Sequence, residues 1–207
     1  MYYYYLYKSL NRVKWKIERF FCKKFCVSYL YKKNSYFDPK SIRFDGMPYL
    51  RIADSATVHI GHSVRIVSTK FLGIDSSVFT KISVAKNSYL IIGNYTGMTN
   101  SIIYSDVGVE IGHHVNIGAG TMIIDSDFHS LDWHDRHDRT DYQNRVSKPI
   151  KIGDYVFIGT RSIILKGVKI GDKAIIAAGS VVSCDIPEGE MWGGNPARYI
   201  KNVPNFV

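Results

Sequence analysis

Aliphatic residues recur at every sixth position along the C-terminal part of the chain. Between residues 152 and 182 the repeating residues are Ile152, Ile158, Ile164, Ile170, Ile176 and Val182. Gly or Ala directly follows four of them, and short side chains such as Ser162 and Ala174 recur four positions after each. The same template occurs in "IGHHVNIGAGTMII", and looser copies surround Ile52, Ile60 and Ile92.

A period of six predicts stacked coils of short strands. An α-helix turns every 3.6 residues, so a six-residue stripe would drift around it. Simple strand alternation does not explain the small residue beside each aliphatic one. If each six-residue unit forms one side of a coil, the aliphatic residue points inward and the small residues allow the chain to turn the corner. Three units then close a triangular coil, and stacked coils bury one aliphatic column.

The N-terminal pattern is different and predicts a helix over residues 1–33. Leu6, Leu10, Val13, Ile17 and Phe20 form a single stripe with spacings of three and four. This segment holds nine Lys or Arg and one acid, a net charge of +8, whereas the rest of the chain carries +1. Two interpretations remain open. The helix packs on the protein or on a partner subunit, or it lies on an anionic membrane surface.

Composition narrows the class of protein. Of 207 residues, 45% are hydrophobic and 22% are charged, as in ordinary globular proteins. No apolar run reaches the ~18 residues of a membrane-spanning helix, and charges interrupt any secretory signal. The three cysteines do not form a disulfide framework, which favours the cytoplasm, and Cys22 and Cys26 alone make a poor zinc site. No nucleic-acid module accompanies the basic segment, so we expect no nucleic-acid partner.

The six-residue register breaks between Ile123 and Ile152, which predicts an extruded loop over residues 125–149. Its first part, "DSDFHSLDWHDRHDR", holds three histidines and five aspartates. The residues alone allow four interpretations: a metal site, an inert polar loop, a loop with one catalytic histidine, or a partner-binding loop. Metal is disfavoured because the histidines lack the fixed spacing of a helical site. Long loops on a regular scaffold commonly carry function.

Residues 50–200 resemble the hexapeptide-repeat acyltransferases. The resemblance implies an all-β fold, a left-handed parallel β-helix of hexapeptide repeats with an extruded active-site loop and an N-terminal helix. The left hand comes only from the resemblance, because parallel crossovers are otherwise right-handed. We expect a helical segment at 1–35, a β-helix domain at 36–200, a tail at 201–207, and a homotrimer.

"DSDFHSLD" is similar to the motif of the sugar O-acetyltransferase branch, which includes the maltose and galactoside acetyltransferases and surface-polysaccharide O-acetyltransferases. On this resemblance His129 removes the proton from the acceptor hydroxyl and returns it to the sulfur of coenzyme A. An imidazole suits this role because its pKa lies near neutrality. The resemblance gives Asp127 or Asp125 the task of orienting His129. Asn100, Trp133 and Arg136 are the expected contacts to the acceptor.

The stretch from Phe157 to Ile200, including "GNPAR", resembles the family's coenzyme A-binding segment. The resemblance implies that the Thr160 amide stabilises the oxyanion and that Gly159 permits close approach. It places Ala178 and Ser183 along the pantetheine arm, and Arg198 and Lys201 near the phosphates. Cys184 departs from the lysine found in many relatives. Acetyl-CoA is the expected co-substrate, and no metal is expected.

These expectations combine into an acetyl-CoA-dependent O-acetyltransferase for a carbohydrate hydroxyl. The expected setting is capsule, O-antigen or exopolysaccharide biosynthesis in a bacterium. The enzyme would be cytoplasmic, with residues 1–33 able to contact the inner membrane face. Two alternatives stay open: an N-acetyltransferase acting on a nucleotide-linked amino sugar or an antibiotic, and a β-helix that serves only as a scaffold.

Overall fold

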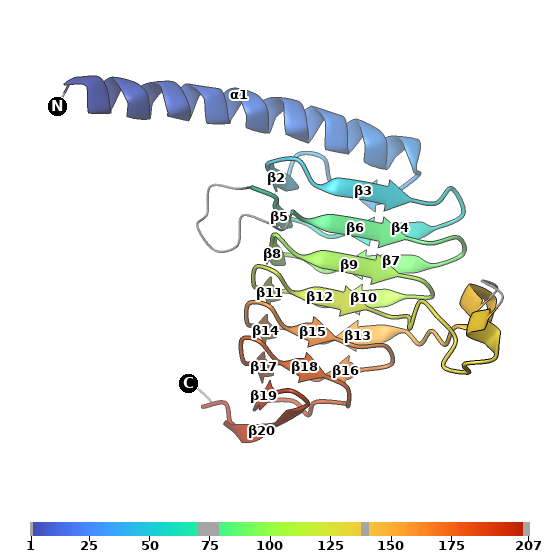
Figure 1. The fold of residues 1–207 in the computed structure, drawn as a ribbon. Helices are drawn as coiled ribbons and strands as arrows, with labels where there is room; N and C mark the ends of the chain where they lie inside the picture. The colour runs from blue at the N-terminus through green and yellow to red at the C-terminus, as the bar shows by residue number, and fades with distance from the viewer. Residues whose placement is uncertain (1, 70–78, 138–140, 205–207) are drawn as a thin grey trace.

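The computed structural model describes residues 2–69, 79–137 and 141–204, with side chains described from residue 16 onward. Helix α1 spans Tyr2–Lys32, and three sheets follow (Figure 1). Sheet A contains β1 (Tyr36–Phe37), β4 (Thr57–Ile60), β7 (Tyr89–Ile92), β10 (Val109–Ile111), β13 (Ile150–Ile152) and β16 (Lys169–Ile170). Sheet B contains β2 (Arg43–Asp45), β5 (Arg65–Val67), β8 (Gly97–Thr99), β11 (Asn116–Ile117), β14 (Phe157–Ile158), β17 (Ile175–Ile176), β19 (Glu190–Gly194) and β20 (Ala197–Asn202). Sheet C contains β3 (Tyr49–Ile52), β6 (Lys81–Val84), β9 (Ile102–Ser105), β12 (Met122–Ile124), β15 (Ile163–Ile164) and β18 (Val181–Val182).

From β1 to β18 successive strands visit sheets A, B and C in turn, so each group of three strands forms one coil. Neighbouring coils pair in parallel, and β19 and β20 form the one antiparallel strand pair in the described part of the chain. In Figure 1 the strands of sheet C run from left to right across the front, and the chain returns behind them one level lower. This course is a left-handed coil. The expected left-handed parallel β-helix is therefore confirmed.

The six-residue repeat forms the core of the prism. Its residues stack in register: Ile111 on Ile152 in sheet A, Ile117 on Ile158 in sheet B, and Ile123 on Ile164 in sheet C. All six are at most 3% exposed. Each such side chain removes enough apolar surface from water to contribute roughly 1.5–3 kcal/mol. The repeat predicted from the sequence therefore supplies the continuous aliphatic column.

The small residues lie at corners where the coils approach closely. A Cβ atom at Gly159 would lie 2.5 Å from the amide nitrogen of Ala178 in the next coil. Left-handed backbone recurs every six residues, at Arg161, Gly167, Lys173 and Gly179. Close contact between neighbouring coils therefore explains the small residue at Gly159, whereas the positive φ falls two residues later, where Arg161 and Lys173 also adopt it.

Helix α1 packs on the first coil through residues outside the apolar stripe seen in the sequence. Cys22, Cys26 and Leu30 are buried, whereas Ile17 and Phe20 are 52% and 55% exposed. The side chains of Leu6, Leu10 and Val13 lie outside the described residues. Only the C-terminal turns of α1 rest on the end of the coil stack, so the contact follows these turns and not the longer stripe (Figure 1).

Hydrogen bonds and ion pairs fix α1 to the first coil. The Tyr29 hydroxyl accepts the amide of Ile52 at 3.0 Å, and Lys33 Nζ lies 2.5 Å from Asp54 Oδ1. Burial raises the pKa of the Cys26 thiol to about 12, so this thiol remains protonated. No helix in the described part of the chain is long and apolar enough to cross a membrane.

Candidate active site

The predicted loop leaves the prism between β12 and β13 and protrudes from the corner that joins sheets C and A (Figure 1). Asp125, the first residue of the loop, anchors it to the β-helix. The buried carboxylate accepts hydrogen bonds from the amides of Asp106, Val107 and Gly108 at 2.7, 2.9 and 2.8 Å. Burial raises the pKa of Asp125, while the three amides favour its charged form. Asp125 therefore fixes the start of the loop to the preceding coil.

An ion pair anchors the returning end of the loop. Arg145 donates to both carboxylate oxygens of Asp106, from Nε at 2.8 Å and from Nη2 at 2.7 Å. The Ser147 hydroxyl also donates to Asp106 at 2.6 Å. The Arg145 guanidinium holds the pKa of Asp106 below its usual value, because the bidentate contact favours the charged carboxylate. Both ends of the loop are thus tied to the strand-to-strand turn at residues 106–108.

His129 forms a hydrogen-bonded pair with Asp141 within this loop. His129 Nδ1 lies 2.6 Å from Asp141 Oδ2. The His129 side chain is 68% exposed, whereas that of Asp141 is 10% exposed. Asp141 begins the 3-10 helix η2 (Asp141–Asn144), which follows the short η1 (Asp135–His137). With the Nδ1 proton facing a carboxylate, the solvent-facing Nε2 is left with a lone pair that can accept a proton.

The expectation that Asp125 or Asp127 orients His129 is wrong. Asp125 accepts hydrogen bonds from the three amides, and Asp127 Oδ1 accepts a hydrogen bond from Lys166 Nζ at 2.6 Å. The partner is Asp141, twelve residues after His129, because the loop folds back through two 3-10 turns. Sequence reasoning missed Asp141, since no local motif links these two positions. The only signal was another acidic residue in an acid-rich loop.

Two of the three residues expected to contact the acceptor, Trp133 and Arg136, lie on the same loop as His129. Arg136 Nη1 donates to the carbonyl of Ser130, the residue after His129, at 2.7 Å. Trp133 is 67% exposed, and its ring stacks on His134 with centroids 3.6 Å apart. Both residues therefore lie on the same extruded loop as His129.

Asn100 does not share that surface. It is 2% exposed, and its side-chain amide pairs with the backbone of Thr69 through two hydrogen bonds of 3.0 and 2.9 Å. The buried amide thus supports the chain's own backbone. The expectation that Asn100 contacts an acceptor is corrected to this structural role.

The remaining loop histidines do not assemble with His129 around a common point. His134 Nδ1 pairs with its neighbour Asp132 at 2.8 Å. No group of three or more His, Cys, Asp or Glu side chains suited to a metal ion occurs among the described residues. Among the described residues of the loop, His129 and His134 therefore pair with two different aspartates, Asp141 and Asp132.

The residues expected to bind coenzyme A lie on the C-terminal coils. Gly159 and Thr160 form the corner between β14 and β15, and Ala178 lies on the equivalent corner of the next coil. Ser183 follows β18 and is exposed, and Arg198 and Lys201 are exposed on β20. The Thr160 amide donates no hydrogen bond to another residue of the described chain. This leaves a backbone donor available at a narrow corner.

His129 and Thr160 lie at opposite ends of sheet C. The loop leaves from the end of β12, whereas Thr160 precedes the start of β15, and these two strands are parallel neighbours. The two residues are therefore separated by the length of the strands of sheet C within one protomer.

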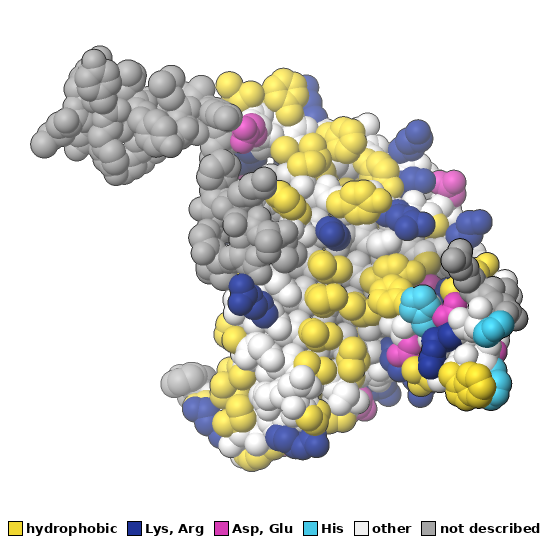
Figure 2. Space-filling model, in the orientation of Figure 1, with side chains coloured by type: hydrophobic (Ala, Val, Ile, Leu, Met, Phe, Trp, Pro, Cys, Tyr) yellow, Lys and Arg dark blue, Asp and Glu magenta, His cyan; other side chains and the backbone are white. Residues whose placement is uncertain are grey.

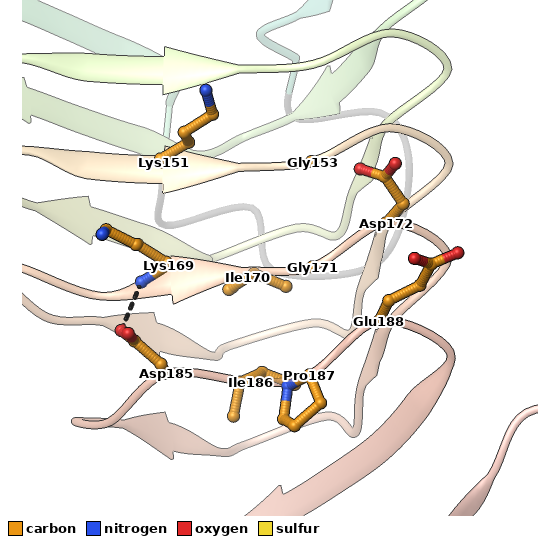
Figure 3. Close-up of a pocket in the computed structure, with 10 residues that line it drawn as sticks. All are labelled: Lys151, Gly153, Lys169, Ile170, Gly171, Asp172, Asp185, Ile186, Pro187 and Glu188. Carbon is orange, nitrogen blue, oxygen red and sulfur yellow. Dashed lines mark hydrogen bonds between the residues drawn. The ribbon is translucent and has the colours of Figure 1, made fainter.

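A separate hollow of about 420 Å³ lies on the outer surface of sheet A (Figure 3). Lys151 and Lys169 reach its rim from β13 and β16, and Asp172, Asp185 and Glu188 contribute opposite charge. The Asp185 carboxylate accepts the Lys169 amide at 2.8 Å, as Figure 3 shows. None of the expected site residues lines this hollow, so it does not enlarge the candidate active site.

Comparison with known proteins shows what the chain is similar to. Residues 149–184 match the family model described as a hexapeptide repeat of succinyl-transferase. The chain is 29% identical to YvoF of Bacillus subtilis (strain 168), which carries the name of an acetyltransferase, over 76% of this chain and 81% of that protein. It is 39% identical to the protein CapG of Staphylococcus aureus, over 47% and 55%.

Solved structures give the same result. The hexapeptide-repeat containing acetyltransferase VCA0836 from Vibrio cholerae aligns with a TM-score of 0.54 and 33% identity, over 61% of this chain and 68% of that one. The polySia-specific acetyltransferase NeuO aligns with a TM-score of 0.60 and 27% identity, over 78% and 71%. The similarity thus extends across most of the described β-helix.

Proposed function

The chain belongs to the hexapeptide-repeat acetyltransferase family, and from this premise we propose that it is an acetyl-CoA-dependent O-acetyltransferase acting on a carbohydrate hydroxyl. The observation that carries the proposal is the His129–Asp141 pair, 2.6 Å apart on a loop tied down at both ends. A structure of the V. cholerae relative contains acetyl-coenzyme A, which supports the donor.

The proposed reaction is a direct transfer with His129 as general base. Nε2 of His129 removes the proton from the acceptor hydroxyl while the hydroxyl oxygen attacks the thioester carbonyl carbon. Asp141 keeps the Nδ1 proton in place and stabilises the imidazolium that forms. The tetrahedral oxyanion receives a hydrogen bond from the Thr160 amide. When the intermediate collapses, the carbon–sulfur bond breaks and the imidazolium protonates the departing sulfur, which restores neutral His129.

We propose a homotrimer in which each site lies between two subunits. The opposite placement of His129 and Thr160 on sheet C supports this arrangement. One subunit supplies the loop with His129, and its neighbour supplies the corner with Gly159, Thr160 and Ala178. Symmetric association of identical chains repeats the same composite site around the axis.

On the donor side, we propose that the pantetheine arm of coenzyme A lies against the corner formed by Gly159, Thr160 and Ala178. At this corner the backbones of two successive coils lie in close contact, and Ser183 is exposed further along the chain. Arg198 and Lys201 place two exposed cations on β20, where they suit the phosphates of coenzyme A. The β-helix domain, residues 36–200, would then hold the donor along its C-terminal coils, with residues 1–35 and 201–207 as flanking segments.

On the acceptor side, we propose a surface polysaccharide or its precursor. Trp133 offers an exposed ring that can stack on a sugar face, and Arg136 braces the turn that follows His129. The similarity to NeuO, whose name specifies polySia, supports a glycan acceptor. The proposed setting is bacterial capsule, O-antigen or exopolysaccharide biosynthesis in the cytoplasm.

Release of free thiol from acetyl-CoA in the presence of a panel of sugars and amino sugars tests this function. We expect turnover with a hydroxyl acceptor and a ~10²–10⁴-fold lower rate in His129→Ala, with acetyl-CoA affinity nearly unchanged. His134→Ala is the matched control, because His134 lies in the same loop and pairs with its own aspartate. Turnover with amines alone would replace the proposal with N-acetylation. A chain that neither binds acetyl-CoA nor releases thiol would be a scaffold.

A further inference from the structure

Helix α1 exposes an apolar face on the side opposite to its packing contact. Cys22, Cys26 and Leu30 face the coil stack. On the opposite side Phe21 and Phe25 are 63% and 61% exposed. An α-helix places residues separated by three, four and seven positions on one side, which brings further residues to this surface. Together they form an aromatic–basic face composed of Ile17, Phe20, Phe21, Lys24, Phe25 and Tyr31.

Cations accompany the exposed rings. Lys24 lies within the face, with Nζ 4.6 Å from the centroid of Phe20. Lys16 and Lys32 are also exposed on the helix, and Glu18 is the single acid in residues 1–33. Figure 2 shows hydrophobic and basic side chains together at this end of the molecule. A solvent-exposed protein surface that combines large apolar side chains with excess positive charge suits the headgroup region of an anionic bilayer.

We propose that α1 docks the protein on an anionic lipid surface through the aromatic–basic face. The rings enter the boundary between headgroups and acyl chains, and the lysine ammonium groups remain at the level of the lipid phosphates. Charge complementarity favours lipid over a second copy of the helix. Two copies would bring two segments of charge +8 together and would bury Lys24 between apolar rings.

The body of the protein holds this face in one direction. Arg19 pairs with the buried Asp45 at 3.1 Å, and Tyr29 and Lys33 bind the first coil. The helix lies across the end of the coil stack, so its free face looks away from the catalytic coils (Figure 1). Docking would therefore set the orientation of the whole β-helix relative to the membrane. In the proposed trimer, cyclic symmetry would present three copies of the face at the same level and strengthen binding through multivalency.

Co-sedimentation of the full chain with vesicles tests the proposal. Vesicles of phosphatidylcholine alone are compared with vesicles that also contain phosphatidylglycerol. We expect binding to the anionic vesicles only, weakened by added salt. Phe21→Ser combined with Phe25→Ser, and separately Lys24→Glu, should each lower the partition coefficient by roughly tenfold. Phe157→Ser is the matched control, because Phe157 is 49% exposed on sheet B, away from α1.

Equal binding to neutral and anionic vesicles, or unchanged binding of both α1 variants, would overturn the proposal. So would a wild-type chain that ignores vesicles but loses self-association in the Phe21 and Phe25 double variant, since the face would then be a contact between copies. Because vesicle binding requires no acetyl transfer, the result is independent of the proposed enzymatic function. The solubility and melting temperature of each variant verify that these exposed substitutions leave the fold intact.

Discussion

Replacing Asp141 with Asn probes the proposed catalytic pair directly. The carboxylate lies 2.6 Å from His129 Nδ1 and is buried, so solvent screens its charge poorly. Asparagine has nearly the same shape but no charge. It can also turn its NH2 group toward Nδ1, which would place the ring proton on Nε2 and leave no base facing the acceptor.

We expect kcat to fall by ~10²–10⁴-fold, which corresponds to about 3–5 kcal/mol of lost transition-state stabilisation. The KM for acetyl-CoA should change little, because Asp141 lies on the loop and not on the corner that holds Thr160. Steady-state kinetics with the best acceptor measure both quantities. Asp132→Asn is the control, since Asp132 makes a comparable 2.8 Å contact with His134 but is exposed.

A fall in kcat of only about threefold would refute this role of Asp141, because we expect a loss of at least ~10²-fold. A loss of activity accompanied by a large fall in melting temperature would instead show that Asp141 only folds the loop. A lower kcat with an unchanged melting temperature would support the role of Asp141 in positioning the base.

Other predictions test the loop anchor, the corner and the core. Arg145→Ala should free the returning end of the loop and lower kcat by roughly 10²-fold. Because Arg145 lowers the pKa of Asp106, the contact between them in the wild type should persist at neutral pH and weaken as the pH falls through that lowered pKa. Limited proteolysis of the loop at different pH values measures this change. Gly159→Ala should cost about 1–3 kcal/mol in thermal unfolding and weaken acetyl-CoA binding, whereas Gly97→Ala, whose Cβ would meet nothing closer than 3.8 Å, should retain acetyl-CoA affinity. Ile164→Ala should cost about 2–5 kcal/mol in denaturant unfolding because Ile164 is fully buried, and a cost below 1 kcal/mol would argue against the stacked core.

The fold was largely predictable because its determinants repeat locally. Each side of a coil needs an inward-facing aliphatic residue and a small residue at its corner, and both needs recur every six residues. Ile152, Ile158 and Ile164 therefore indicated the three sheets before any contact was known. The break in this register likewise located the extruded loop.

The sequence did not identify the packing face of α1, for a physical reason. Ile17 and Phe20 continue the longest apolar stripe, yet they face away from the protein, while Cys22 and Cys26 are buried. Apolar spacing identifies a helix and its possible faces. It does not decide which face meets the protein when two faces are apolar and only part of the helix rests on the coils.

The sequence by itself determined the repeating coil and the position of the loop, and its resemblance to a known family pointed to His129 as the candidate base. The tertiary structure decided that Asp141 is the group paired with His129 and that His129 and Thr160 lie at opposite ends of sheet C. Asp141 reaches His129 only because the loop folds back on itself, and Asp127 is drawn to Lys166 from a neighbouring coil. Side-chain pairing across a loop depends on the path of the backbone in space, and a period of six residues carries no information about a segment that leaves the repeat.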